Sequence, residues 1–184
     1  MTRFKQAGLA MLGRTACPEF GINATAESLA NGPTRNPWDT VLTTGGSSAL
    51  VAARALPLAH GNDAGGSLRQ PAAWCGLVGL KPTRGRIATG PDYDELLYGQ
   101  GIEFALTRTV RDAATLLDAV NGPATGDKYE IVPPARPYAE ELGMDPGQLR
   151  IALTTRAWSG APVDNEHVKA IESVGRTLDS LGTS

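Results

Sequence analysis

The chain has 184 residues, of which 41% are hydrophobic and 20% are charged, and its formal net charge is −2. This length and composition predict one globular domain with its own core. The basic residues are scattered singly, which argues against nucleic acid as a partner. Cys17 and Cys75 stand far apart, so neither a disulfide framework nor a zinc site is expected.

The first half of the chain is rich in glycine and proline. The expected elements, in order, are a weak helix over 3–12, irregular chain over 14–44, a helix over 49–55, a short buried strand over 56–59, a polar glycine-rich loop over 60–71 and a second buried strand over 76–80. The N-terminus shows neither a signal peptide nor a membrane span, so we expect a cytoplasmic protein without membrane contact.

The clearest helix of the second half is predicted over 110–121, with Thr109 as its N-cap and Gly122 as its terminator. A strand is expected over 149–154, and Asp164 is expected to cap a last helix. Strands and helices alternate, which indicates the α/β class.

Two glycine-serine clusters, at 44–48 and 64–67, lie on either side of a predicted helix and strand. A serine hydroxyl is a poor nucleophile at neutral pH, and it needs a base together with backbone N–H donors for the oxyanion. Glycine lets such donors converge because it has no Cβ. His60 and Asp63 lie too close to Ser67 along one local stretch to favour a Ser-His-Asp triad.

Four segments in one order carry a resemblance to the amidase signature family. They are Asn-Pro-Trp-Asp at 36–39, Thr-Gly-Gly-Ser-Ser at 44–48, the run around Gly-Asn-Asp-Ala-Gly-Gly-Ser-Leu-Arg at 57–72 and Gly-Leu-Val-Gly-Leu-Lys-Pro-Thr-Arg-Gly-Arg at 76–86. The segments 60–63 and 105–112 are most similar to the bacterial branch that contains aminohexanoate cyclic-dimer hydrolases. The resemblance implies part of the amidase-signature fold, a mixed twisted sheet flanked by helices.

The resemblance also implies a mechanism. Ser67 is the expected nucleophile, and the backbone N–H groups of Ala64, Gly65, Gly66 and Ser67 are the expected oxyanion hole. Ser47, behind a cis peptide bond, is the expected proton relay to a lysine base. The implied substrate is a small linear or cyclic carboxamide, with no metal and no cofactor.

The chain departs from the family pattern in three ways. The family's catalytic lysine lies in a segment that would precede Met1, and the four lysines present stand in other contexts. The Gly-Ser segment is about four residues short, so the relay position falls on Ser47 when counted from Trp38 and on Thr43 when counted from Ser67. The C-terminal part is also missing. We therefore expect residues 1–184 to be a single partial amidase-signature domain, inactive as this fragment.

Other interpretations stay open. The chain could be a non-catalytic remnant or scaffold, or the amidase-like subunit of a transfer-RNA-dependent amidotransferase. A phosphate-binding loop at 61–66 is disfavoured, because neither GxxxxGK[ST] nor GxGxxG occurs. Asp63 and Arg69 are expected to brace the serine loop rather than to contact substrate. The sequence does not indicate an oligomeric state.

Overall fold

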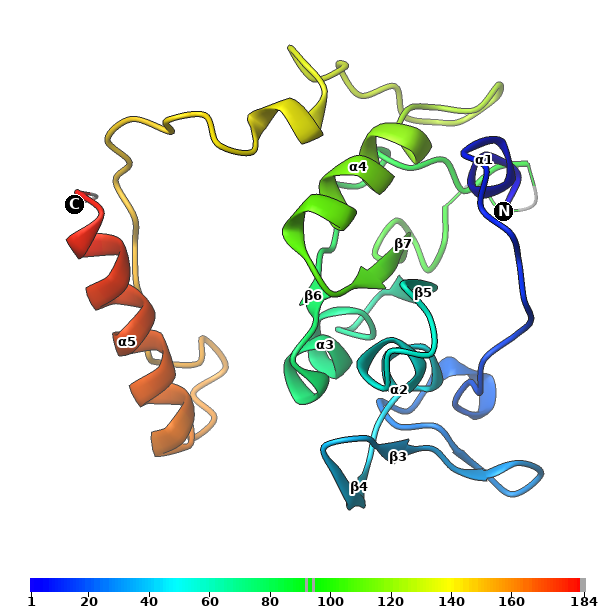
Figure 1. Cartoon of the computed structure of the whole chain (residues 1–184), viewed down its shortest axis with the longest axis horizontal. Coiled ribbons are helices and arrows are strands. Elements are labelled where there is room, and N and C mark those ends of the chain that lie inside the picture. The colour runs from blue at the N-terminus through cyan, green and yellow to red at the C-terminus, as the bar shows by residue number, and fades with distance from the viewer. Residues whose placement is uncertain (92, 94, 183–184) are drawn as a thin grey trace. The chain divides into compact units, whose positions relative to one another are not determined.

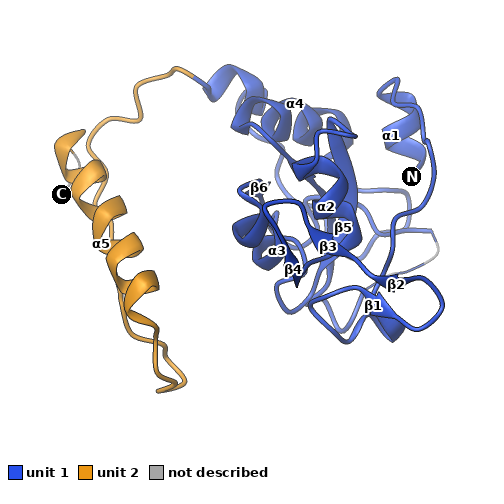
Figure 2. Ribbon diagram, turned by 60° about the horizontal axis from the view of Figure 1, so that its bottom comes forward, with its two compact units in different colours: residues 1–142 blue, residues 143–184 orange. Residues whose placement is uncertain are grey.

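The computed structural model describes residues 1–91, 93 and 95–182 (Figure 1). These residues form two compact units, 1–142 and 143–184, which are described separately (Figure 2). The elements of the first unit are α1 (Thr2–Gln6), η1 (Glu19–Gly21), β1 (Glu27–Ser28), β2 (Gly32–Pro33), β3 (Arg35–Asn36), β4 (Asp39–Thr43), α2 (Gly46–Ala52), β5 (Leu58–Asp63), α3 (Arg69–Cys75), β6 (Val78–Gly79), β7 (Ile102–Thr107), α4 (Val110–Val120) and η2 (Tyr138–Glu141). The second unit contains α5 (Asn165–Ser180).

The centre of the first unit is an antiparallel sheet in the order β5-β7-β6. β5 pairs with β7 along its whole length, from Leu58 opposite Thr107 to Asp63 opposite Ile102. Figure 1 shows α4 and α1 on one side of these strands and α2 and α3 on the other. Because both faces of the sheet are covered, β7 is almost wholly buried, and Phe104 at its centre is fully enclosed.

The helix α4 forms as its capping signals predict. The Thr109 hydroxyl accepts a hydrogen bond from the Asp112 N–H at 3.0 Å. At the other end, Arg3 of α1 donates to the carbonyls of Val120 and Asn121, each at 2.8 Å, and to those of the next two residues. A guanidinium is well suited to this place because it carries several donors and meets the negative end of the helix dipole. Arg3 thereby links α1 to the C-terminal end of α4 through hydrogen bonds.

Several expectations for individual elements are wrong. The segment 14–44 is not simply loop, because it contains two small antiparallel pairs, β1 with β2 and β3 with β4. These strands have two to five residues, too few to show a clear alternation. The first helix ends at Gln6, and the second starts at Gly46 rather than at residue 49. All strand pairs among the described residues are antiparallel.

In the second unit, the expected strand over 149–154 is absent and this stretch is irregular. The apolar residues there find no strand partner in the described part of the unit. Leu153 instead packs on α5, where a Cβ added at Gly175 would lie 2.8 Å from its Cδ1. The expected Asp164 cap is confirmed, since its carboxylate accepts from the Glu166 N–H at 2.8 Å.

No helix in the described part of the chain is both long enough and apolar enough to cross a membrane.

Candidate active site

Ser67 lies on the short connection between β5 and α3, and it is exposed. The preceding strand β5 pairs with the central strand β7 along its whole length, and the following helix packs on β6 and α2. Pro71 stands in the first turn of α3, where its missing N–H costs no helical hydrogen bond. Two well-packed elements therefore hold the ends of a connection that presents a serine to solvent.

The buried carboxylate of Asp63 stabilises this connection by accepting hydrogen bonds from its backbone. Its Oδ1 accepts from the Gly66 N–H at 2.8 Å, and its Oδ2 accepts from the N–H groups of Leu68 and Arg69, each at 3.3 Å. The Arg69 guanidinium adds two further bonds of 2.9 Å, one to each oxygen. The expectation that Asp63 and Arg69 brace the loop is confirmed.

The pKa of Asp63 reflects this arrangement. Burial alone would raise the pKa, because a carboxylate is poorly solvated inside the protein. The hydrogen bonds from the Arg69 side chain and from the Arg69 and Leu68 N–H groups, together with the positive charge of Arg69, act more strongly in the opposite direction. The pKa falls from 3.8 to about 2, so Asp63 is ionised at neutral pH.

The backbone donors of the loop divide into two groups. The Gly66 N–H is used by Asp63, so the expectation that it faces an oxyanion is not met in this structure. Gly66 has a φ of +126°, a conformation that favours glycine, and this turn directs its N–H inward. Among the described residues, the N–H groups of Ala64, Gly65 and Ser67 donate to no other group.

Ser47 occupies the first turn of α2. Its Oγ lies 2.9 Å from the His60 carbonyl oxygen, to which it donates, and 2.9 Å from the Thr15 hydroxyl. The expected cis peptide before Ser47 is wrong, since the Gly46–Ser47 bond is trans and Gly46 already belongs to the helix. The physical reason is the short segment before α2, because only Thr44 and Gly45 lie between β4 and the helix and Gly45 is already its N-cap.

The alternative relay, Thr43, is the last residue of β4 and donates its hydroxyl to the Glu27 carboxylate. Neither Ser47 nor Thr43 forms a hydrogen bond with Ser67 within the described ranges. The two candidate relays thus lie in different surroundings, and only Ser47 is bonded to the strand that leads to Ser67.

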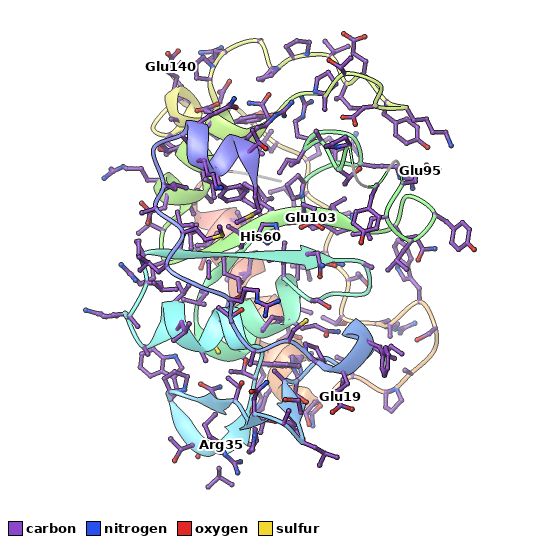
Figure 3. All side chains as sticks on the ribbon, turned by 90° about the vertical axis from the view of Figure 1, so that its right-hand side faces the viewer. Glu19, Arg35, His60, Glu95, Glu103 and Glu140 are labelled. Atoms are coloured by element: carbon purple, nitrogen blue, oxygen red, sulfur yellow. The ribbon has the colours of Figure 1, made fainter. Side chains whose placement is uncertain are left out.

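His60 and Glu103 face each other on the neighbouring strands β5 and β7 (Figure 3). Their side chains form an ion pair of 2.7 Å when the histidine is protonated, and the rings of His60 and Phe4 pack in a T-shaped arrangement. Asp63 is likewise occupied by Arg69. The histidine and the aspartate of the disfavoured triad are therefore engaged with partners other than Ser67.

Sequence reasoning did not identify the residues that hold the far end of α3. The Asn36 amide donates to the Trp74 carbonyl at 2.9 Å, and the Trp38 indole donates to the Cys75 carbonyl at 2.8 Å. These bonds satisfy carbonyl groups that a helix leaves unpaired at its C-terminus. The Asn-Pro-Trp segment could have signalled this role, because asparagine and tryptophan both carry a side-chain N–H donor.

A buried cluster of small polar side chains joins α2 to α3. The Thr44 hydroxyl lies 3.0 Å from the Ser48 hydroxyl and 3.3 Å from the Cys75 sulfur, and Ser48 also donates to the Gly45 carbonyl. All three side chains are fully buried. No group of three metal-binding side chains occurs among the residues that the structure describes.

The chain matches known amidases over its whole length. The family profile named Amidase covers residues 1–184. The 6-aminohexanoate-cyclic-dimer hydrolase of Paenarthrobacter ureafaciens is 45% identical over 188 aligned residues, which are 98% of this chain and 38% of that protein.

Two solved structures show the same likeness. A 6-aminohexanoate cyclic dimer hydrolase complexed with substrate is similar with a TM-score of 0.93 at 41% identity, over 100% of this chain and 40% of that one. A bacterial aryl acylamidase of the amidase signature family gives 0.88 at 30% identity, over 99% and 38%. This chain thus spans 38% to 40% of the length of these relatives. The expected α/β class is confirmed as a part of their fold, and the chain belongs to the amidase signature family.

Proposed function

We propose that the protein is an amide hydrolase in which Ser67 attacks the carbonyl carbon of a small linear or cyclic carboxamide. The observation that carries this proposal is the loop geometry, in which an exposed serine follows a turn fixed by the buried carboxylate of Asp63. A rigid loop keeps the nucleophile and its neighbouring N–H donors in one arrangement before substrate arrives.

The reaction is acyl transfer through two tetrahedral intermediates. Attack by Ser67 Oγ forms a C–O bond and converts the carbonyl oxygen into an oxyanion. The N–H groups of Ala64, Gly65 and Ser67 are the proposed donors to this oxygen, because those three are uncommitted. Loss of the amine then leaves an acyl-enzyme, which water hydrolyses to the free acid.

The proton of Ser67 must reach the departing amine, and we assign Ser47 as the relay. Its position is supported by its bond to the His60 carbonyl on β5, the strand that runs into the serine loop. The base that would complete the relay is a lysine, and none of the described lysines bonds to Ser67 or Ser47. We therefore propose slow turnover, or none, for residues 1–184 alone.

A non-catalytic scaffold is the second candidate. It is favoured by the trans bond before Ser47 and by the two bonds that already occupy its hydroxyl. Both features suit a structural residue in the first turn of a helix. The two functions are separated by the chemical reactivity of Ser67.

Treatment with a fluorophosphonate probe is expected to label the purified chain at Ser67, and Ser67→Ala is expected to abolish this labelling. Oxyanion donors alone retain roughly 10³-fold catalysis over water in serine hydrolases that lack their base, so stoichiometric labelling should persist without a lysine. Intact-protein mass spectrometry measures the adduct. Labelling that survives in Ser67→Ala contradicts the assignment, and an unlabelled but folded parent supports the scaffold.

Ser47→Ala is expected to slow the labelling of Ser67 by roughly tenfold, below the usual range for general base catalysis because no lysine completes the relay. Thr43→Ala is the matched control, since it also removes a hydrogen-bonded hydroxyl, but one that is bonded to Glu27 and not to the strand that leads to Ser67. Its labelling rate should equal that of the parent. The opposite pattern, with a slow Thr43→Ala and an unchanged Ser47→Ala, would move the relay to Thr43.

A further inference from the structure

An open hollow adjoins Ala64, the first residue of the serine loop. It is lined by Ala64, Lys81, Arg84, Gly99 and Gln100. The side chains of this lining supply two positive charges and one amide, and no carboxylate is among the described lining residues. The proposed acyl-transfer steps use none of these three polar side chains.

Lys81 is the more informative of the two cations. It is half-buried, it follows the end of β6 closely, and the next residue is a buried proline that restricts the backbone. No ion pair or hydrogen bond joins its ammonium group to another described residue. A partly desolvated ammonium without a partner gains more from an incoming anion than a fully solvated one does.

Arg84 also lines this hollow, and its side chain passes close to Gly99. A Cβ added at Gly99 would lie 3.0 Å from the Arg84 Nε, so the absence of a side chain there lets the guanidinium stem pass close to the backbone. Glu95 lies near the Arg84 side chain. Its carboxylate is bonded to Lys128 at 2.8 Å and to the Tyr129 hydroxyl. These two bonds and the charges of Lys128 and Arg84 lower the pKa of Glu95. Glu95 thus offsets part of the charge of Arg84, whereas no carboxylate of the described residues is bonded to Lys81.

We propose that this hollow binds a carboxylate of the substrate, with Lys81 as the main ligand and Arg84 as the second. The inference rests on the proposed function, because Ala64 would hold the reacting carbonyl beside the hollow. It adds a substrate class, namely carboxamides that carry a free carboxylate a few bonds from the amide. The attraction is electrostatic and weakens with rising salt.

Ligand binding tests this site without any turnover. Amide chemical shifts of the ¹⁵N-labelled Ser67→Ala variant are followed during titration with succinamate, which carries an amide and a carboxylate, and with butyramide, its neutral counterpart. Succinamate is expected to bind about tenfold more tightly, a difference of about 1.4 kcal/mol. Adding Lys81→Met should remove this preference and leave butyramide binding unchanged.

Lys5→Met is the matched control, since Lys5 is an exposed lysine on α1, and it should keep the full preference. Arg84→Gln, at an exposed residue, should reduce the preference in a folded protein even if Lys81→Met is unstable. Equal affinity for the two ligands, no saturable shift with succinamate, or a preference that survives Lys81→Met overturns the proposal. Because the titration uses Ser67→Ala, a failure of the probe-labelling experiment is a separate result.

Discussion

Replacing Asp63 with alanine is expected to lower the free energy of unfolding of the first unit by roughly 3 kcal/mol, the upper end of the range for leaving a buried hydrogen-bonding group without its partner. The side chain of Asp63 has no exposed surface, and it accepts hydrogen bonds from three backbone N–H groups and from Arg69. Alanine would leave the inward-facing N–H of the buried Gly66 without an acceptor. Urea denaturation followed by circular dichroism measures the change.

Asp63→Asn separates the charge of this group from its shape. The pKa of Asp63 is about 2 in the folded chain and 3.8 ordinarily, so the folded state holds its proton less tightly. The stabilisation is therefore complete above pH 3.8 and is lost as the pH falls from 3.8 through 2. The parent should lose stability over this interval more steeply than Asp63→Asn does. Superimposable acid-unfolding curves for the two proteins would contradict the role given to the charge.

How far the site could be predicted depends on whether the signal was local. The Gly-Gly-Ser turn and the bracing pair of Asp63 and Arg69 lie within seven residues, and both are visible in the sequence. The hydrogen bond from the Gly66 N–H to Asp63 could not be predicted from the sequence, because it depends on the orientation of a single peptide group. The cis bond before Ser47 was inferred from the family and failed because helix α2 begins three residues earlier than its apolar pattern suggests.

The fold shows the same limit at the level of elements. Helix α4 was predicted well because a cap, an apolar face and a terminator coincide within fourteen residues, 109–122. The helix α3 was missed, although Pro71 in its first turn and Gly76 with a φ of +64° at its end are both helix-boundary signals. Because of its glycines, the segment 60–71 was assigned to a loop, and this assignment included the start of α3. The strand β7 was missed because both of its faces are covered, which leaves no polar alternation.

Gly46→Ala is expected to destabilise the first unit by roughly 3 kcal/mol, the upper end of the usual range for overpacking. A Cβ at Gly46 would lie 2.2 Å from the carbonyl oxygen and 2.7 Å from the nitrogen of Ala16. Because the obstacle is backbone, it cannot move aside by rotating a side chain. The segment around Ala16 must withdraw from α2, and the contact of 2.9 Å between Thr15 and Ser47 should break with it.

Gly45→Ala is the matched control one residue away. A Cβ there meets only the Ser48 Oγ at 3.5 Å and Pro71 atoms at 3.7 Å or more, which are ordinary contacts, and no positive φ is involved. Its cost should stay near 1 kcal/mol, the value for a poor N-cap residue. Trypsin provides a second measurement, because the exposed Arg14 lies beside the segment that must withdraw. Faster cleavage after Arg14 in Gly46→Ala but not in Gly45→Ala is expected. Equal stability and equal cleavage of the two variants would show that Ala16 does not limit the space at the start of α2.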